Sequence, residues 1–316
     1  MIRLVIDDAA WAPDDVAPDD LEDALHALAD RILVSTRRRE RVGFYVDLWN
    51  QTLVGTHTLS MLIHEADNPR ALSRDVRRRL ARLFDELSSD TFDESALPAL
   101  EVEIHGERLL SPAAVFAWTA TSERRAIGCI TPFTSARNGR LSVSIDGHHQ
   151  LVHFITDEAT HVAFFRDAIR IENADEDDFA ALAPSAFPAL VFVDGVFRGL
   201  RDLSRPYRDR REDLILHFSV LSDHGPAIFA LGHNAKIETE FMSRKITISR
   251  ETRETIADGR CRRARERAHR GTVLVFDWHT KIELHLDRIH VYWDADTADG
   301  KVLVGVIHRH LPLPGD

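Results

Sequence analysis

The apolar and polar positions along the chain follow two different periods, and the period changes several times between the two ends. Apolar residues spaced three and four apart predict amphipathic helices, and these spacings occur over residues 19–33, 71–87, 158–171 and 205–225. Strict alternation is typical of strands with one buried face, and it occurs over residues 99–106 and 141–155. The second of these runs has Asp146-Gly147 near its centre and predicts a β-hairpin.

Residues 233–316 combine alternating runs with one short helical run. Alternation predicts strands over residues 235–242 and 245–251. Asp258 and Gly271 are suited to begin and end a short helix between residues 257 and 271. Three more strand patterns then predict an antiparallel meander, over residues 272–282, 287–294 and 300–311.

These patterns predict an α+β fold that mixes helical and antiparallel β modules and ends in a helix followed by a β-meander. A chain of 316 residues is long enough for two or three modules. The polar run at residues 88–98 is typical of a linker. We therefore expect an N-terminal α/β module at residues 1–98, a module of a hairpin plus helices at 99–232, and a β-rich module at 233–316.

The net charge of −11 is unevenly distributed along the chain. Residues 1–232 carry 25 basic and 38 acidic residues, whereas residues 233–316 carry 15 and 13. The acidic majority argues against nucleic-acid binding over the whole surface, but the C-terminal region keeps a local basic face. All four lysines lie in the last 81 residues, among 36 arginines in the whole chain. Since lysine can lose its proton and arginine cannot, a lysine kept against this bias is a candidate functional residue.

The composition also indicates a cellular location. The bias toward Arg, Ala and Asp suggests a GC-rich bacterial genome. The chain begins with a short predicted strand followed by acids, unlike a signal peptide, and no apolar run approaches the roughly 18–20 residues that a membrane helix needs. Two distant cysteines, Cys129 and Cys261, argue against a disulfide framework. We expect a bacterial cytoplasmic protein with no membrane partner.

Arginine covers most of the predicted helix at residues 257–271. Arginine binds the phosphate backbone of nucleic acids electrostatically, and single-stranded or looped RNA is a common target of such segments. We therefore expect this helix to bind nucleic acid, RNA more than DNA, through Arg260, Arg262, Arg263, Arg265 and Arg267.

Five of the 17 histidines lie between residues 279 and 310, within the predicted meander. Alternate residues of a strand share one face, so residues 302, 304, 306, 308 and 310 are expected on one face of the last strand. The basic and imidazole groups of the three strands can then meet at one end of the sheet, although the register between strands is not visible in the sequence. The candidate catalytic residues are His279, Lys281, Arg288, His290, His308 and His310.

Such a set of side chains is sufficient for RNA cleavage without a metal or other cofactor. Two imidazoles can act as general base and general acid near neutral pH. Arg288 or Lys281 can stabilise the additional negative charge when a ribose 2′-hydroxyl attacks its own phosphate.

The C-terminal region resembles the RelE/ParE toxin superfamily. The resemblance covers about 80 residues and lies in a helix followed by an antiparallel meander, with "LDRIHVYW" as the middle strand and "VLVGVIHRH" as the last. It implies ribosome-associated mRNA cleavage or gyrase poisoning, with Arg288 as the middle-strand arginine and His308 or His310 as the general acid. The chain departs from that family in having one short helix rather than a helical hairpin, and in its acidic extension of about 230 residues.

Three alternatives remain open at this point. Zinc or manganese could bind His279, His308 and His310, with a carboxylate from Asp277, Asp287 or Asp294, and support a metal-dependent phosphodiesterase. The spacing of Arg211 and His217 on a predicted helix resembles that of helical HEPN ribonucleases. The protein could also be a non-catalytic subunit of a larger defence complex, with residues 1–232 binding the partner protein.

Overall fold

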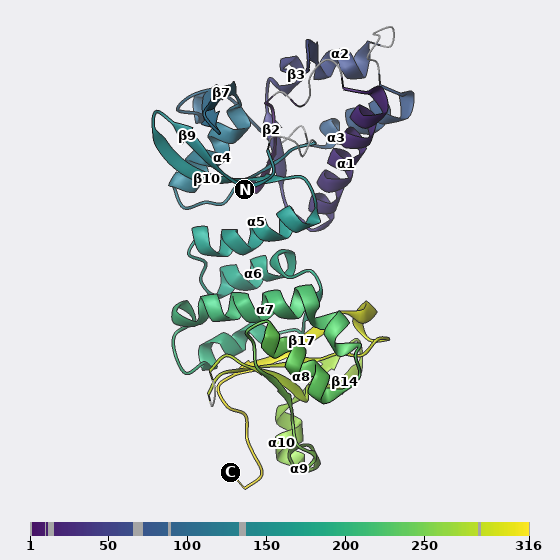
Figure 1. Ribbon diagram of the computed structural model, residues 1–316, viewed down its shortest axis with the longest axis vertical. Coiled ribbons are helices and arrows are strands. Elements are labelled where there is room, and N and C mark those ends of the chain that lie inside the picture. The colour runs from purple at the N-terminus through teal and green to yellow at the C-terminus, as the bar shows by residue number, and fades with distance from the viewer. Residues whose placement is uncertain are drawn as a thin grey trace. The chain divides into compact units, whose positions relative to one another are not determined.

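The computed structural model describes residues 2–9, 11, 16–65, 72–87, 90–132, 137–283 and 286–315. The fold mixes helices with several β-sheets, which confirms the predicted α+β class. The chain divides into two compact units, Met1–Asn173 and Ala174–Asp316 (Figure 1). No helix within the described ranges is long and apolar enough to cross a membrane.

The first unit is built around an eight-stranded sheet with the strand order β5-β2-β1-β8-β10-β9-β6-β7. Its strands are β1 (Leu4–Ile6), β2 (Val42–Tyr45), β5 (Thr91–Phe92), β6 (Glu101–Ile104), β7 (Glu107–Leu110), β8 (Gly128–Ile130), β9 (Gly139–Ile145) and β10 (His148–Ile155). Its helices are α1 (Pro18–Arg37), α2 (Leu59–His64), α3 (Arg74–Leu87), α4 (Pro112–Ser122) and α5 (Glu158–Ile171), with short elements η1 (Leu48–Asn50), β3 (Thr52–Val54), β4 (His57–Thr58) and η2 (Glu94–Ala96).

The pairing of β1 removes the predicted boundary at residue 98. This strand lies between β2 and β8 and is parallel to both, so residues from either side of position 98 form one sheet. The parallel pairs were not expected, since short apolar runs do not reveal which strands they will join. The hairpin of β9 and β10 is confirmed, with Asp146 and Gly147 both at positive φ in its two-residue turn.

Two buried carboxylates follow β1 at the carboxyl edge of the parallel strands. Asp7 is paired with Arg137, and Asp8 accepts hydrogen bonds from the Ser111 hydroxyl and the Ala113 amide at the start of α4. Burial, and then the neighbouring Asp7, raise the pKa of Asp8 to about 8. Asp7 therefore joins the end of β1 to Arg137, and Asp8 joins it to the start of α4.

The second unit is built around a five-stranded sheet with the order β11-β17-β16-β15-β12. Its strands are β11 (Leu190–Phe192), β12 (Ile248–Arg250), β15 (Trp278–Lys281), β16 (Arg288–Tyr292) and β17 (Val302–His308), and a separate hairpin contains β13 (Glu266–His269) and β14 (Thr272–Val275). Its helices are α6 (Glu176–Ala186), α7 (Tyr207–Phe229), α8 (Asn234–Ser243), α9 (Arg253–Ala257) and α10 (Gly259–Ala264), with η3 (Val196–Asp202) and η4 (Ala298–Gly300).

The two faces of this sheet are covered by different elements. Phe229 of α7 packs against Trp278, and His217 of the same helix hydrogen-bonds Thr280, so α7 covers one face. Phe276, just before β15, packs against Tyr292 on the other face. The predicted meander of β15, β16 and β17 is confirmed as antiparallel.

Several predictions for residues 233–316 are wrong. Residues 235–242 form helix α8 rather than a strand, with Ile237 and Phe241 buried one turn apart. The boundary predicted at residue 232 also fails, because α7 and the C-terminal strands belong to one compact unit. Asp258 caps α10 as predicted, but α10 ends at Ala264, and Arg267 lies on β13. The strand predicted over residues 272–282 is divided into β14, which pairs with β13, and β15, which belongs to the five-stranded sheet.

Candidate functional site

A row of three basic side chains crosses the second sheet. Lys281 of β15 lies directly opposite Arg288 of β16, which lies directly opposite His308 of β17. Directly paired residues point to the same face, and neighbouring strands are about 4.8 Å apart. We call these three residues the basic row.

The basic row depends on a β-bulge in β17. His290 pairs with Val306, whereas the next residue, Val291, pairs with Val304, so Gly305 is an extra residue in β17. The bulge places Val304 and Val306 on opposite faces, which overturns the expected common face of residues 302–310. It also places His308 on the same face as His290 and Arg288.

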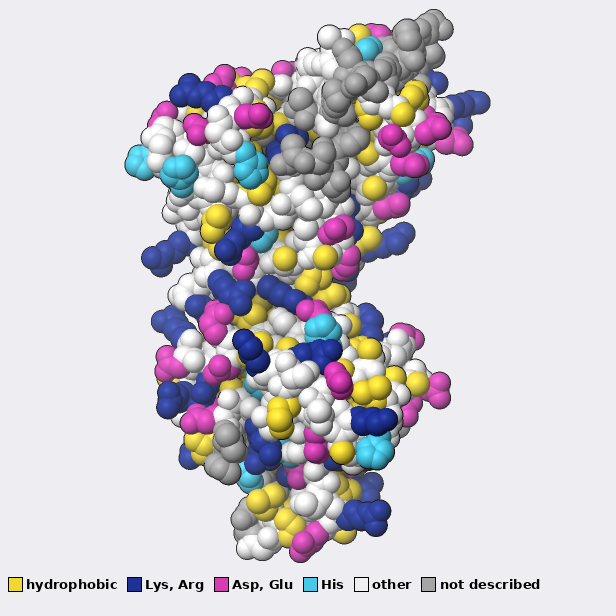
Figure 2. All heavy atoms as spheres, in the orientation of Figure 1, with side chains coloured by type: hydrophobic (Ala, Val, Ile, Leu, Met, Phe, Trp, Pro, Cys, Tyr) yellow, Lys and Arg dark blue, Asp and Glu magenta, His cyan; other side chains and the backbone are white. Residues whose placement is uncertain are grey.

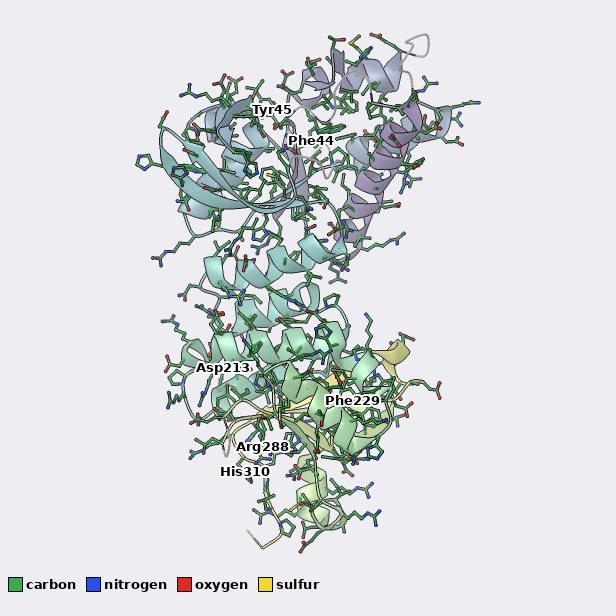
Figure 3. The ribbon with its side chains drawn as sticks, viewed as in Figure 1. Phe44, Tyr45, Asp213, Phe229, Arg288 and His310 are labelled. Carbon is green, nitrogen blue, oxygen red and sulfur yellow. The ribbon has the colours of Figure 1, made fainter. Side chains whose placement is uncertain are left out.

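All three members of the row are partly exposed, as is His310 just beyond β17. Figure 3 shows Arg288 and His310 on the side of the sheet opposite to Phe229 of α7. Figure 2 shows basic and acidic side chains intermixed over the visible face of the second unit, so positive charge there is local. Asp202 is an acidic neighbour of His308, with its Oδ2 4.0 Å from His308 Nε2.

His279 and His290 lie beside the row but are buried. They are paired across β15 and β16 with ring centroids 5.2 Å apart, and their exposed fractions are 3% and 0%. Burial, and then the Arg288 charge, lower the pKa of His279 to about 3. Burial, and then His279, lower the pKa of His290 well below its usual value. Both imidazoles are therefore neutral at pH 7, and neither reaches a ligand on the surface directly.

Hydrogen bonds identify the ring nitrogen that holds the lone pair in each imidazole. The Phe276 carbonyl can only accept, so His290 Nδ1 donates to it at 3.2 Å and His290 Nε2 has the lone pair. The Arg288 guanidinium can only donate, so His279 Nε2 accepts from it. The Ser249 hydroxyl lies 3.1 Å from the same His279 nitrogen.

Glu251 lies behind His279 and is held by Arg265. Its Oε1 is 2.9 Å from Arg265 Nε and 3.4 Å from His279 Nδ1, and its side chain is 6% exposed. Arg265 also donates to the carbonyls of Cys261 and Pro312. This buried arginine links α10, the edge of the sheet and the C-terminal segment.

The arginine-rich helix is therefore only partly available for nucleic acid. Arg260, Arg262 and Arg263 are exposed on α10. Arg265 is 2% exposed and paired with Glu251, so the prediction that it binds nucleic acid is wrong. Arg267 is half-buried on β13, where its guanidinium donates to the carbonyls of residues 264 and 266.

The predicted metal ligands do not come together as expected. Instead of His279 with His308 and His310, one ligand atom each from Glu251, His279 and His290 lie within 4.8 Å of one another. Asp277 is bound by Arg250. Asp287 is fully buried and bound by Arg210 and Ser204. Asp294 does not belong to the group of Glu251, His279 and His290.

The HEPN-like spacing has a structural explanation. His217 is 5% exposed and lies on the side of α7 that faces the sheet, where its Nδ1 is 2.9 Å from the Thr280 hydroxyl. This is the face of the sheet opposite to the basic row. Burial lowers the pKa of His217 to about 4. A neutral imidazole in this position packs the helix against the sheet.

Ser249 and Glu251 were not singled out from the sequence. They are two residues apart at the edge of the sheet, and Ser249 pairs with His279. The alternation of "KITISRE" carries the signal that both belong to one face. The partner strand was not visible, so their proximity to His279 was not predicted.

Comparison with protein-family models, with curated proteins and with solved structures finds no match. The resemblance to the RelE/ParE superfamily stays a prediction.

Proposed function

We propose that the second unit binds RNA across the basic row and cleaves it as a toxin-like or phage-defence ribonuclease. The observation that carries this proposal is the direct pairing of Lys281, Arg288 and His308 across three neighbouring strands. Three adjacent donors on one face match the repeated phosphates of a nucleic-acid backbone.

Arg288 and Lys281 are assigned to phosphate. The Arg288 side chain is partly exposed, so the open part of its guanidinium can meet a phosphate at the surface. A guanidinium can bind phosphate through two N–H groups, and an ammonium adds a compact charge. The exposed arginines of α10, Arg260 and Arg262 among them, extend the electrostatic attraction.

The proton transfers are assigned to His308 and His310, because His279 and His290 are buried. One imidazole takes the proton of the ribose 2′-hydroxyl as its oxygen forms a bond to phosphorus. The other gives a proton to the departing 5′-oxygen as the phosphorus–oxygen bond breaks, leaving a 2′,3′-cyclic phosphate. Arg288 stabilises the charge that develops on the phosphoryl oxygens. This reaction needs no cofactor, and its substrate belongs to the bacterial cytoplasm.

The acidic first unit is assigned to regulation through a protein partner. Residues 1–173 carry 28 acidic and 19 basic residues, and this acidic excess suits a basic partner surface and disfavours RNA. RNA binding without cleavage would fit a non-catalytic subunit of a larger complex.

RNA integrity after induced expression in bacteria tests the proposal. The informative variant replaces the accessible groups, Lys281→Gln/His308→Gln/His310→Gln. A matched control changes one lysine and two histidines that are exposed on or next to α7 and α8, Lys236→Gln/His224→Gln/His233→Gln. Wild type and the control should cut RNA, and the cut ends should be 2′,3′-cyclic phosphates.

The site variant should leave RNA intact at equal abundance. Intact RNA with all three proteins would contradict cleavage. Equal cutting by wild type and the site variant would place the chemistry elsewhere. Mapping the cut positions separates ribosome-guided cutting from general cutting.

A further inference from the structure

The buried cluster of Glu251, His279 and His290 has the donor set of a transition-metal site. Two imidazoles and one carboxylate are a common three-ligand set for zinc, with a water molecule as the fourth ligand. One ligand atom from each residue lies within 4.8 Å of the other two. The set differs from the three histidines that the sequence pattern suggested.

The two ring nitrogens that would bind a cation, His290 Nε2 and His279 Nδ1, are buried without hydrogen-bond partners. His290 Nε2 is fully buried and has no hydrogen-bond partner, while its Nδ1 is tied to the Phe276 carbonyl. Such a second bond fixes the ring and leaves the other nitrogen for a metal. His279 Nδ1 is also buried without a hydrogen-bond partner, although Glu251 Oε1 is only 3.4 Å away. Two atoms that bind the same ion, such as His279 Nδ1 and Glu251 Oε1, would lie this close without forming a hydrogen bond.

The surrounding side chains supply the outer contacts of such a site. Arg265 donates to Glu251 Oε1 at 2.9 Å and holds the carboxylate toward the histidines. Ser249 Oγ lies 3.1 Å from His279 Nε2 and can accept a hydrogen bond from Nε2–H. Outer contacts of this kind orient metal ligands.

Arg288 opposes a cation in two ways. Its charge is close to the cluster, and it donates to His279 Nε2, which places the imidazole proton on Nδ1. Binding of an ion at Nδ1 therefore moves that proton to Nε2, where Nε2–H donates a hydrogen bond to Ser249 Oγ, and separates Arg288 from the ring. Arg288 belongs to the basic row, so the ion and the row are coupled through one side chain.

We propose that Glu251, His279 and His290 bind a zinc ion beneath the basic row. The proposal goes beyond RNA binding and does not depend on it, since the three ligands are buried and the row is at the surface. Zinc is named because imidazole nitrogens with one carboxylate suit it better than calcium or magnesium, which prefer oxygen ligands.

Metal content and cobalt spectroscopy test the site without any RNA. The full-length protein is stripped with a chelator, dialysed against zinc, and measured for zinc per chain by elemental analysis. Co²⁺ in place of Zn²⁺ reports the geometry through its visible absorption. The variants are His290→Gln and Glu251→Gln, and the control is His217→Gln, which removes a buried histidine on the opposite face.

Wild type and the His217→Gln control should each hold one zinc ion per chain and show the absorption of tetrahedral cobalt. Each ligand variant should weaken zinc binding about tenfold to a hundredfold or more. Circular dichroism identifies variants that fail to fold, and the wild-type measurement stands without them. A wild-type protein that holds no zinc, or variants that hold it as tightly as wild type, would overturn the proposal. Either result leaves RNA binding to be judged by its own experiment.

Discussion

Arg288 and His308 face each other across β16 and β17 because β17 contains one extra residue, Gly305. Without that bulge the alternation of the strand would turn His308 toward α7. The glycine is also required by packing, since a Cβ at position 305 would lie 2.4 Å from ring carbons of Phe276. The Phe276 carbonyl in turn holds His290.

Gly305→Ala is therefore expected to destabilise the protein by about 1–3 kcal/mol, as overpacking of a close contact does. The measurement is urea unfolding followed by tryptophan fluorescence. Gly259→Ala is a suitable control, because its Cβ would come no closer than 3.4 Å to Arg263 Nη1. Equal stability of the two variants would show that Phe276 adjusts without cost.

Arg265 and Glu251 form a buried ion pair, so removal of one partner leaves the other charge without compensation. Arg265→Gln is expected to cost about 3–5 kcal/mol of unfolding free energy. Arg263→Gln, on the exposed side of α10, is expected to change it by less than about 0.5 kcal/mol. If Arg265 were instead an RNA contact, its replacement would weaken RNA binding with little loss of stability.

The raised pKa of Asp8 predicts that the free energy of unfolding falls as the pH rises. Its folded-state pKa of about 8 lies above the ordinary value of 3.8, so the folded state holds the proton more tightly than the unfolded state. The resulting stabilisation is complete below about pH 4 and is lost as the pH rises to 8, at a slope of up to roughly 1.4 kcal/mol per pH unit. Asp8→Asn should flatten this slope between pH 5 and 8. An unchanged slope in the variant would assign the pH dependence to other groups.

The hydrogen bond from Arg288 to His279 Nε2 keeps the proton on Nδ1, so Arg288 should lower the affinity of the cluster for zinc. Arg288→Gln should bind zinc more tightly than wild type, because it removes a positive charge and a donor to His279 Nε2. Competition with a zinc chelator measures the difference. Weaker binding in this variant would mean that Arg288 supports the cluster rather than opposing it.

The elements with strong periodicity could be predicted from the sequence, whereas their partners could not. The helices α1, α3, α5 and α7, the hairpin at Asp146-Gly147 and the C-terminal meander follow from local pattern. The alternation over residues 235–242 predicts a strand, but it coincides with the one-turn spacing of Ile237 and Phe241 on helix α8. The boundary near residue 98 failed because β1 pairs with β8, which lies more than 120 residues later.

In the candidate site, too, the features of a single strand could be predicted from the sequence, whereas the contacts between strands could not. Strand parity correctly predicts that Arg288 and His290 share one face of β16, since alternation needs only the strand itself. Burial of His279 and His290, the bulge at Gly305 and the approach of Glu251 depend on neighbouring strands. Register and burial are properties of the assembled sheet, and a single strand does not contain them.

The most direct test of the account is the salt dependence of RNA binding by the purified protein, measured with a single-stranded RNA. Replacement of one phosphate-binding lysine should lower the slope of log affinity against log salt by about 0.7. Lys281→Gln should show this reduction, and Lys236→Gln on α8 should keep the wild-type slope. Binding that is absent in wild type, or equal slopes for wild type and both variants, would contradict the assignment of the basic row to RNA.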